Sequence, residues 1–117
     1  MGQLEDELRV ALAERGIESR VRHVVANGLA DGVPPMRVVA GRLALSERTL
    51  HRRLADEGLR YQDIVVDVRR AVATSLLTTT DHSLVDIAFL TGFADQSAFQ
   101  RAFKRWTGRT PLAVRRS

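Results

Sequence analysis

Two segments of this chain repeat one plan, and the repeat restricts the possible fold more than any other feature. Residues 39–54, VAGRLALSERTLHRRL, and residues 87–103, IAFLTGFADQSAFQRAF, each begin with an aliphatic residue followed by alanine. After three more residues come a turn position, an apolar residue and a capped stretch with apolar side chains at helical spacing. A small alanine lets a second helix cross the first closely, and a tight turn favours glycine. The pattern therefore predicts two helix-turn-helix units.

The turn position differs between the two repeats. Gly92 suits a left-handed turn, whereas the first repeat has Ala44 at the matching position. If Ala44 adopts the left-handed conformation, we expect a cost of up to about 1 kcal/mol.

The rest of the chain shows helical spacing and no strand-like alternation. The longest periodic segment, residues 62–77, places Val65, Val68, Val72 and Leu76 three or four residues apart and would span roughly 24 Å. Good N-caps precede four expected helices, and glycine or proline marks most helix ends. These caps are Ser46, Ser83, Asp95 and Thr110.

We therefore predict an all-α fold of about seven helices, in which a linker helix joins two helix-turn-helix subdomains. The expected divisions are residues 21–60 for the first subdomain, 61–80 for the linker helix and 81–117 for the second subdomain. Residues 1–20 contain an amphipathic segment, LEDELRVALAERG, followed by a second helical pattern. This segment is either an interdomain linker helix or an extra helix packed on the domain.

The second helix of the first unit has two distinct faces. Leu50 and Leu54 share one side, and stepping 100° per residue places Arg48 and Arg52 opposite them. Thr49 and His51 lie on the flanks.

The second helix of the other unit repeats this division with larger side chains. Phe99, Ala102, Phe103 and Trp106 follow the spacing of a buried stripe, and we expect Phe89 and Phe93 in the same core. The opposite side carries Ser97, Arg101 and Lys104, with Gln100 on a flank and Gln96 in the first turn.

Charge indicates what the outward faces contact. The net charge is +4, and the residues from position 101 to the end include six basic and no acidic side chains. Neither outward face has an acidic residue, and arginine and glutamine pair bidentately with guanine and adenine edges in the major groove. Two such helices about 34 Å apart fit successive major grooves of DNA.

The chain resembles the DNA-binding domain of the AraC/XylS family of bacterial transcription regulators over about four-fifths of its length. The resemblance is carried by RLALSERTLHRRLADEGLRYQDIVVDVRRAVATSLL and SLVDIAFLTGFADQSAFQRAFKRWTGRTPLAVRR. It implies sequence-specific binding to double-stranded promoter DNA and activation, less often repression, through RNA polymerase. It also implies that an effector-sensing or dimerisation domain, carried by most members, is absent from this chain.

The resemblance assigns roles to individual positions. Base-reading residues would be Arg48, His51, Arg52, Gln96, Ser97, Gln100 and Arg101. Contacts to the DNA backbone would come from Ser46, Thr49, Lys104, Arg105, Arg109 and Thr110. Two departures are Ala44, where the family usually has the turn glycine, and Leu54, where phenylalanine is common.

Other classes of protein fit less well. The three histidines lie on separate expected elements without a partner spacing for catalysis or metal binding, so we expect no enzyme, cofactor or metal. Apolar runs of four residues or fewer exclude a membrane-spanning helix. The lack of cysteine suits the cytoplasm, where a DNA-binding regulator would associate with the nucleoid. The alternative is a helical protein-interaction module whose basic face meets an acidic partner.

Overall fold

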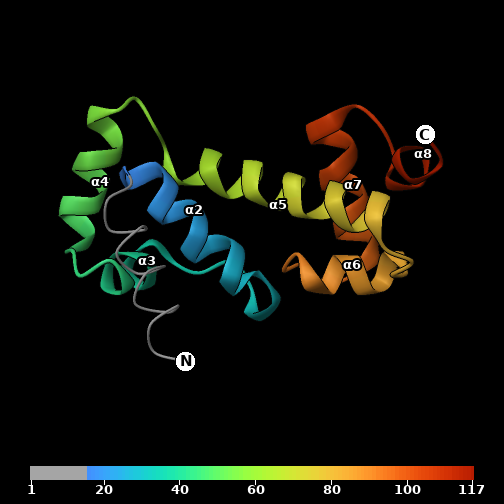
Figure 1. Ribbon diagram of the computed structural model, residues 1–117, viewed down its shortest axis with the longest axis horizontal. Coiled ribbons are helices and arrows are strands. Elements are labelled where there is room, and N and C mark those ends of the chain that lie inside the picture. The colour runs from blue at the N-terminus through green and yellow to red at the C-terminus, as the bar shows by residue number, and fades with distance from the viewer. Residues whose placement is uncertain (1–15) are drawn as a thin grey trace.

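The computed structural model describes residues 16–117, and this range consists of helices and connecting loops without a strand (Figure 1). The elements are α2 (Ile17–Gly28), η1 (Leu29–Asp31, a 3-10 helix), α3 (Met36–Arg42), α4 (Glu47–Asp56), α5 (Tyr61–Thr79), α6 (Leu84–Leu90), α7 (Gln96–Thr107) and α8 (Pro111–Arg116). The predicted all-α class is confirmed. The helix expected before residue 16 lies outside the described residues.

The predicted caps define the helix starts. The side chains of Ser46, Ser83, Asp95 and Thr110 each accept a hydrogen bond from the backbone N–H three residues ahead, at 2.7 to 3.1 Å. Each cap satisfies one of the N–H groups that a helix start leaves without a partner. The linker helix α5 has 19 residues and a length of about 28 Å, so it is longer than the segment of residues 62–77 predicted from the apolar spacing.

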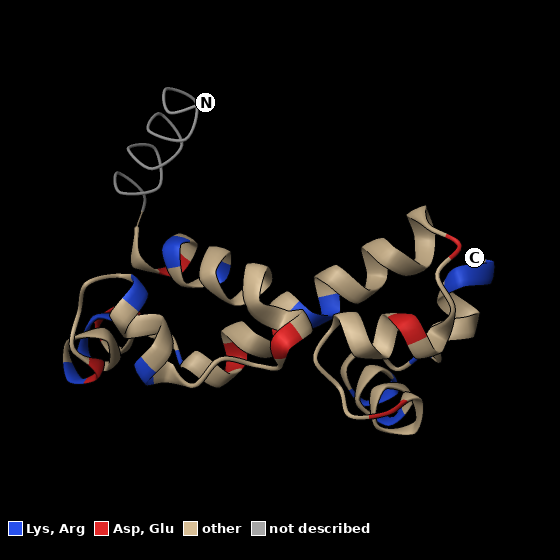
Figure 2. Ribbon diagram, turned by 90° about the horizontal axis from the view of Figure 1, so that it is seen from below, with Lys and Arg blue, Asp and Glu red and all other residues tan. Residues whose placement is uncertain are grey.

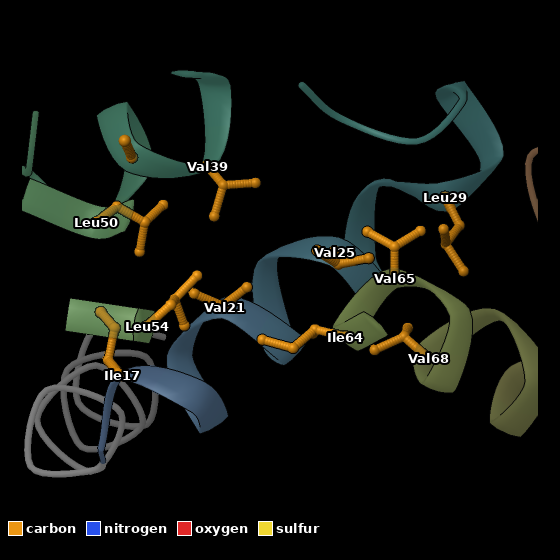
Figure 3. Close-up of a cluster of buried hydrophobic side chains, with 11 residues drawn as sticks. Ile17, Val21, Val25, Leu29, Val39, Leu50, Leu54, Ile64, Val65 and Val68 are labelled. Atoms are coloured by element: carbon orange, nitrogen blue, oxygen red, sulfur yellow. The ribbon is translucent and has the colours of Figure 1, made fainter. Parts of the chain in front are cut away.

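The first core lies among four helices and is entirely aliphatic in its buried residues (Figure 3). Helix α2 with η1, helices α3 and α4, and the first half of α5 all contribute side chains. The buried members are Ile17, Val21, Val25, Leu29, Val39, Ala40, Leu50, Leu54, Ile64, Val65 and Val68.

The second core is smaller and contains aromatic rings. Phe99 and Phe103 of α7 are fully buried with ring centroids 5.7 Å apart, and Phe93 packs at 5.7 Å from Phe99 and 5.8 Å from Trp106. The second half of α5 contributes Ala73 and Leu77. Helix α5 thus belongs to both cores, which makes it the linker between two helix-turn-helix units. We call α3 with α4 the first unit, and α6 with α7 the second unit.

The prediction that Phe89 is buried was wrong. Helix α6 buries Ile87 and Ala88, and the side chain of Phe89 is 65% exposed beside Val85, which is 58% exposed. In a helix of seven residues only one side can face the core. Residues 85 and 89 are four apart, so both lie on the other side.

Candidate nucleic-acid interface

The turn of the first unit brings α4 across α3. The backbone N–H of Leu45 donates to the carbonyl of Ala40 at 2.9 Å, and the N–H of Ala44 donates to Gly41 at 3.1 Å. Ala44 has φ of +57°, the one non-glycine residue with positive φ among the described residues. Ala44 therefore adopts the left-handed conformation, which the sequence had left open at this turn.

The second unit uses the same hydrogen bonds at the matching positions. Phe93 N–H donates to Ala88 at 2.9 Å and Gly92 N–H donates to Phe89 at 3.0 Å, with Gly92 at φ of +84°. Ala40 and Ala88, the small residues expected at the crossings, are both 1% exposed. The sequence repeat is thus a repeat of backbone geometry.

Helix α4 presents the side predicted for it. Leu50 and Leu54 are buried, whereas Arg48, His51 and Arg52 are exposed. The hydroxyl of Ser46 accepts from the N–H of Thr49 at 3.0 Å and donates to the Thr49 hydroxyl at 2.8 Å. The two hydroxyls therefore lie together at the start of α4, and each can both donate and accept a hydrogen bond.

Helix α7 divides in the same way. Phe99, Ala102 and Phe103 face the core, while Ser97 and Arg101 are exposed. Gln96 and Gln100 are half-buried, as expected for positions at the edges of the apolar stripe.

The remaining backbone candidates lie at the end of α7 and just beyond it. Lys104, Arg105, Arg109 and Thr110 are all exposed. Arg109 also donates to the carbonyl of Ala113 at 3.2 Å.

Counting from each cap residue, the two exposed faces align. Arg48 matches Ser97, His51 matches Gln100, and Arg52 matches Arg101. Helices α4 and α7 stand near opposite ends of α5, and basic positions lie at both ends of the molecule (Figures 1 and 2). Each helix thus offers basic and hydrogen-bonding groups at matching places.

The basic side chains of these faces are available for a ligand. Within residues 16–117, ion pairs join Arg22 to Glu18 and Asp67, and Arg70 to Asp67, so none involves α4 or α7. An exposed guanidinium without a carboxylate partner keeps its charge and its donors for an anion or a base edge.

Two arginines have internal roles that the sequence reasoning missed. Arg69 of α5 donates from Nε to the carbonyl of Thr91 and from Nη2 to that of Gly92, both at 2.9 Å. Arg115 of α8 donates from Nε to the carbonyl of Leu77 at 3.1 Å and from Nη2 to that of Thr80 at 3.2 Å. From the sequence, Arg115 was identified only as one of the basic residues of the C-terminal end. A signal existed for Arg69, because it lies on the apolar stripe of α5 between Val65 and Val72.

The described part of the chain has neither a membrane-spanning helix nor a cluster of metal-binding side chains. No helix there has the length and apolar character needed to cross a membrane. No group of three His, Asp or Glu side chains in residues 16–117 is arranged to hold a metal ion.

Comparison with known proteins defines the class. Residues 39–117 match the model of a helix-turn-helix domain family. The chain is 39% identical over 113 residues to the ornithine utilization regulator of Pseudomonas aeruginosa, covering 97% of this chain and 33% of that protein. With the two units described above, these matches show that the chain belongs to the AraC/XylS family of DNA-binding transcription regulators.

Solved structures agree with this assignment. The transcriptional regulator CdpR from Pseudomonas aeruginosa is similar with a TM-score of 0.74 and 36% identity, over 87% of this chain and 32% of that one. The DNA-binding domain of AdpA, solved in complex with a target DNA, gives a TM-score of 0.68 and 26% identity, over 86% of this chain and 91% of that one. The chain spans about a third of the length of the ornithine regulator and of CdpR.

Proposed function

We propose that this domain binds double-stranded promoter DNA in a sequence-specific manner by placing α4 and α7 in two successive major grooves. The observation that carries the proposal is the alignment of two exposed faces, free of acidic residues at the outward positions, on two units with the same turn geometry. The major groove admits an α-helix and displays a distinct pattern of donors and acceptors for each base pair. The similarity to the AdpA domain, which was solved with its target DNA, supports the same mode of binding.

The two helices would read different sequences. Helix α4 is suited to guanine edges, since arginine pairs bidentately with guanine and the helix presents Arg48 and Arg52. His51 lies beside them on the same exposed face. In α7 the amides of Gln96 and Gln100 suit adenine, Arg101 suits guanine, and Ser97 pairs with either. The two half-sites should therefore be unlike each other rather than a direct repeat.

The backbone contacts would come from the helix starts and from the basic end of the second unit. Ser46 and Thr49 lie at the positive end of the α4 dipole, where a phosphate is favoured. At the end of α7 and just beyond it, a phosphate would meet the side chains of Lys104, Arg105, Arg109 and Thr110. Such contacts fix the register of the protein on DNA without reading bases.

The whole protein would act as a transcription regulator on the nucleoid in the cytoplasm. We propose that it activates transcription through RNA polymerase, and that an effector-sensing or dimerisation domain lies outside this chain. The length of the relatives, about three times that of this chain, supports the second point.

Selection from a pool of random DNA duplexes tests the function. We expect the domain to enrich duplexes with two unlike half-sites, and its binding to weaken as salt rises, with log K falling by about 0.9 per phosphate contact for each unit of log salt. Salt-dependent binding with no enriched sequence would contradict sequence-specific recognition and favour the protein-interaction module with a basic face.

A further inference from the structure

Arg69 is held in an unusual environment for a linker-helix residue. Its guanidinium donates to two adjacent carbonyls of the second unit's turn, Thr91 and Gly92, and its Cζ lies 3.7 Å from the centroid of the Phe93 ring. Burial lowers the pKa of Arg69, and no ion pair within residues 16–117 includes it. A half-buried cation with these partners orients the turn, because the planar fork of arginine fits only one arrangement of the two carbonyls.

The same turn touches the other half of the molecule. A Cβ atom on Gly92 would lie 2.8 Å from the carbonyl oxygen of Leu29 and 3.5 Å from Gly32 Cα and Val33 N. Helix α6 accordingly packs against η1, and in Figure 1 the two lie beside each other below α5. The turn of the second unit thus rests directly on the loop that leads into the first unit.

Helix α5 also holds that loop from its own start. The hydroxyl of Tyr61 donates to the carbonyl of Pro34, three residues beyond η1. Helix α5 therefore contacts two segments. Tyr61, at the N-terminus of α5, contacts the loop of residues 29–34, and Arg69, eight residues farther along α5, contacts the turn of residues 91–93. The loop and the turn also contact each other, so the three segments form a closed junction.

We propose that Arg69 and Gly92 fix the second unit in one orientation relative to the first, so that the domain measures the spacing between its two half-sites. The inference rests on the proposed function, in which α4 and α7 bind one DNA duplex together. Arg69 is a positioning residue, because it acts on α7 through the turn and does not itself face the exposed sides of the recognition helices.

The consequence for DNA follows from helix geometry. One base pair added between the half-sites moves the second half-site by about 3.4 Å and rotates it by roughly 34° around the axis. If the junction allows only one orientation of the two units, α7 cannot move to the displaced half-site. If the junction is flexible, the second unit can reorient and bind it.

The experiment measures affinity for the selected duplex and for duplexes with one base pair inserted or deleted between the half-sites. The variant R69Q is compared with R70Q, which removes the same charge from the neighbouring, exposed position, whose ion pair within residues 16–117 is with Asp67. The wild type and R70Q should lose about tenfold in affinity when the spacing changes, and R69Q should lose less than about threefold. Affinity of R69Q for the first half-site alone should stay at the wild-type value.

Two further variants keep the test decisive if R69Q does not fold. R69K preserves the charge, but a single ammonium cannot reproduce the two-pronged contact, so it should also flatten the spacing profile. G92A places a Cβ against Leu29, while G58A has a similar positive φ of 72° with no atom within 4 Å of its Cβ. We expect G92A to flatten the profile and G58A to leave it unchanged.

The outcomes separate the inference from the function on which it rests. A folded R69Q or R69K with the full wild-type spacing preference would overturn the inference while leaving the proposed function intact. An equal flattening by R70Q would also overturn it, since the effect would then be one of charge. A wild-type domain that enriches no duplex would instead remove the proposed function.

Discussion

The first unit is held by aliphatic packing, whereas the second unit depends on aromatic rings and half-buried arginines. The first core contains eleven buried residues drawn from α2, η1, α3, α4 and α5. The second contains seven, among them Phe99 and Phe103, with Phe93 against their edge. A phenylalanine buries more surface than a valine or leucine. Each buried phenylalanine therefore contributes more to the stability of the second core than a single aliphatic residue contributes to the first.

The arginines sharpen the contrast. In each unit the preceding helix sends an arginine to the carbonyl of the residue that caps the C-terminus of the unit's first helix. Arg20 of α2 makes this one bond, to Leu43 at 3.4 Å. Arg69 of α5 makes two bonds at 2.9 Å, to the cap residue Thr91 and to Gly92, and its guanidinium lies over the Phe93 ring. The two units therefore share the same backbone hydrogen bonds in their turns but differ in the number and length of the arginine hydrogen bonds to those turns. The turn of the second unit is held by more and shorter arginine hydrogen bonds, and the core of that unit has fewer buried residues.

The largest effect should follow from truncating the second core. Phe103→Ala removes a fully buried ring and should lower the free energy of unfolding by about 3–5 kcal/mol. Urea or thermal unfolding measures this change. Phe89→Ala is the matched control, because the side chain of Phe89 is 65% exposed. The free energy of unfolding of this variant should be within about 0.5 kcal/mol of the wild-type value. Equal losses for the two variants would show that the division of α6 and α7 into buried and exposed sides is wrong.

Removing matching arginines from the two recognition helices should cost less but act on DNA. Arg52→Ala and Arg101→Ala should each weaken binding to the selected duplex by about 1–3 kcal/mol. Each should relax specificity at one base pair, in the first half-site for Arg52 and in the second for Arg101. Quantitative binding to duplexes changed one base pair at a time tests both. If the two variants relax the same half-site, the assignment of one helix to each half-site fails.

The two left-handed positions that flank α4, Ala44 before it and Gly58 after it, should respond in opposite directions to exchange of alanine and glycine. Ala44→Gly removes a left-handed strain of up to about 1 kcal/mol at φ of +57°, and after the entropy cost of glycine, roughly 0.5 kcal/mol or more, we expect up to about 0.5 kcal/mol of added stability. Gly58→Ala, at a glycine with positive φ and open surroundings, should be destabilising instead. Comparison of unfolding midpoints at constant m-value checks the sign. A loss of stability in Ala44→Gly would mean that this turn is not strained.

The smallest expected effect concerns the exposed basic end of α7. Lys104→Ala should weaken binding by a similar factor on all duplexes and should reduce the magnitude of the salt slope by about one. Binding measured at four salt concentrations on cognate and random duplexes tests this. A change confined to the cognate duplex would show that Lys104 reads a base.

Local rules were sufficient to predict most of the fold. Apolar spacing located the helices, and the cap residues located their starts, because both depend on residues within one or two turns of each other. The repeat predicted the turn position in both units and the left-handed glycine at Gly92, whereas it left the conformation of Ala44 open. The exposed positions of Arg52 and Arg101 followed from helical geometry alone.

The errors and omissions concern contacts between elements. Phe89 was expected in the core because large aromatic residues are usually buried, yet a short helix with one packed side leaves it exposed. The internal bonds of Arg69 and Arg115 span 22 to 38 residues in sequence, so no local pattern specifies their partners. A cation on an apolar stripe indicates a buried contact, but only the tertiary arrangement identifies the carbonyls.

The central claim, that two recognition helices engage one duplex together, is tested most directly by a methylation-interference footprint on a selected duplex. The account predicts two major-groove patches on one face of the DNA, with centres about 10–10.5 base pairs apart. Arg52→Ala should weaken one patch and Arg101→Ala the other. A single patch, or two patches on opposite faces, would contradict simultaneous binding by α4 and α7.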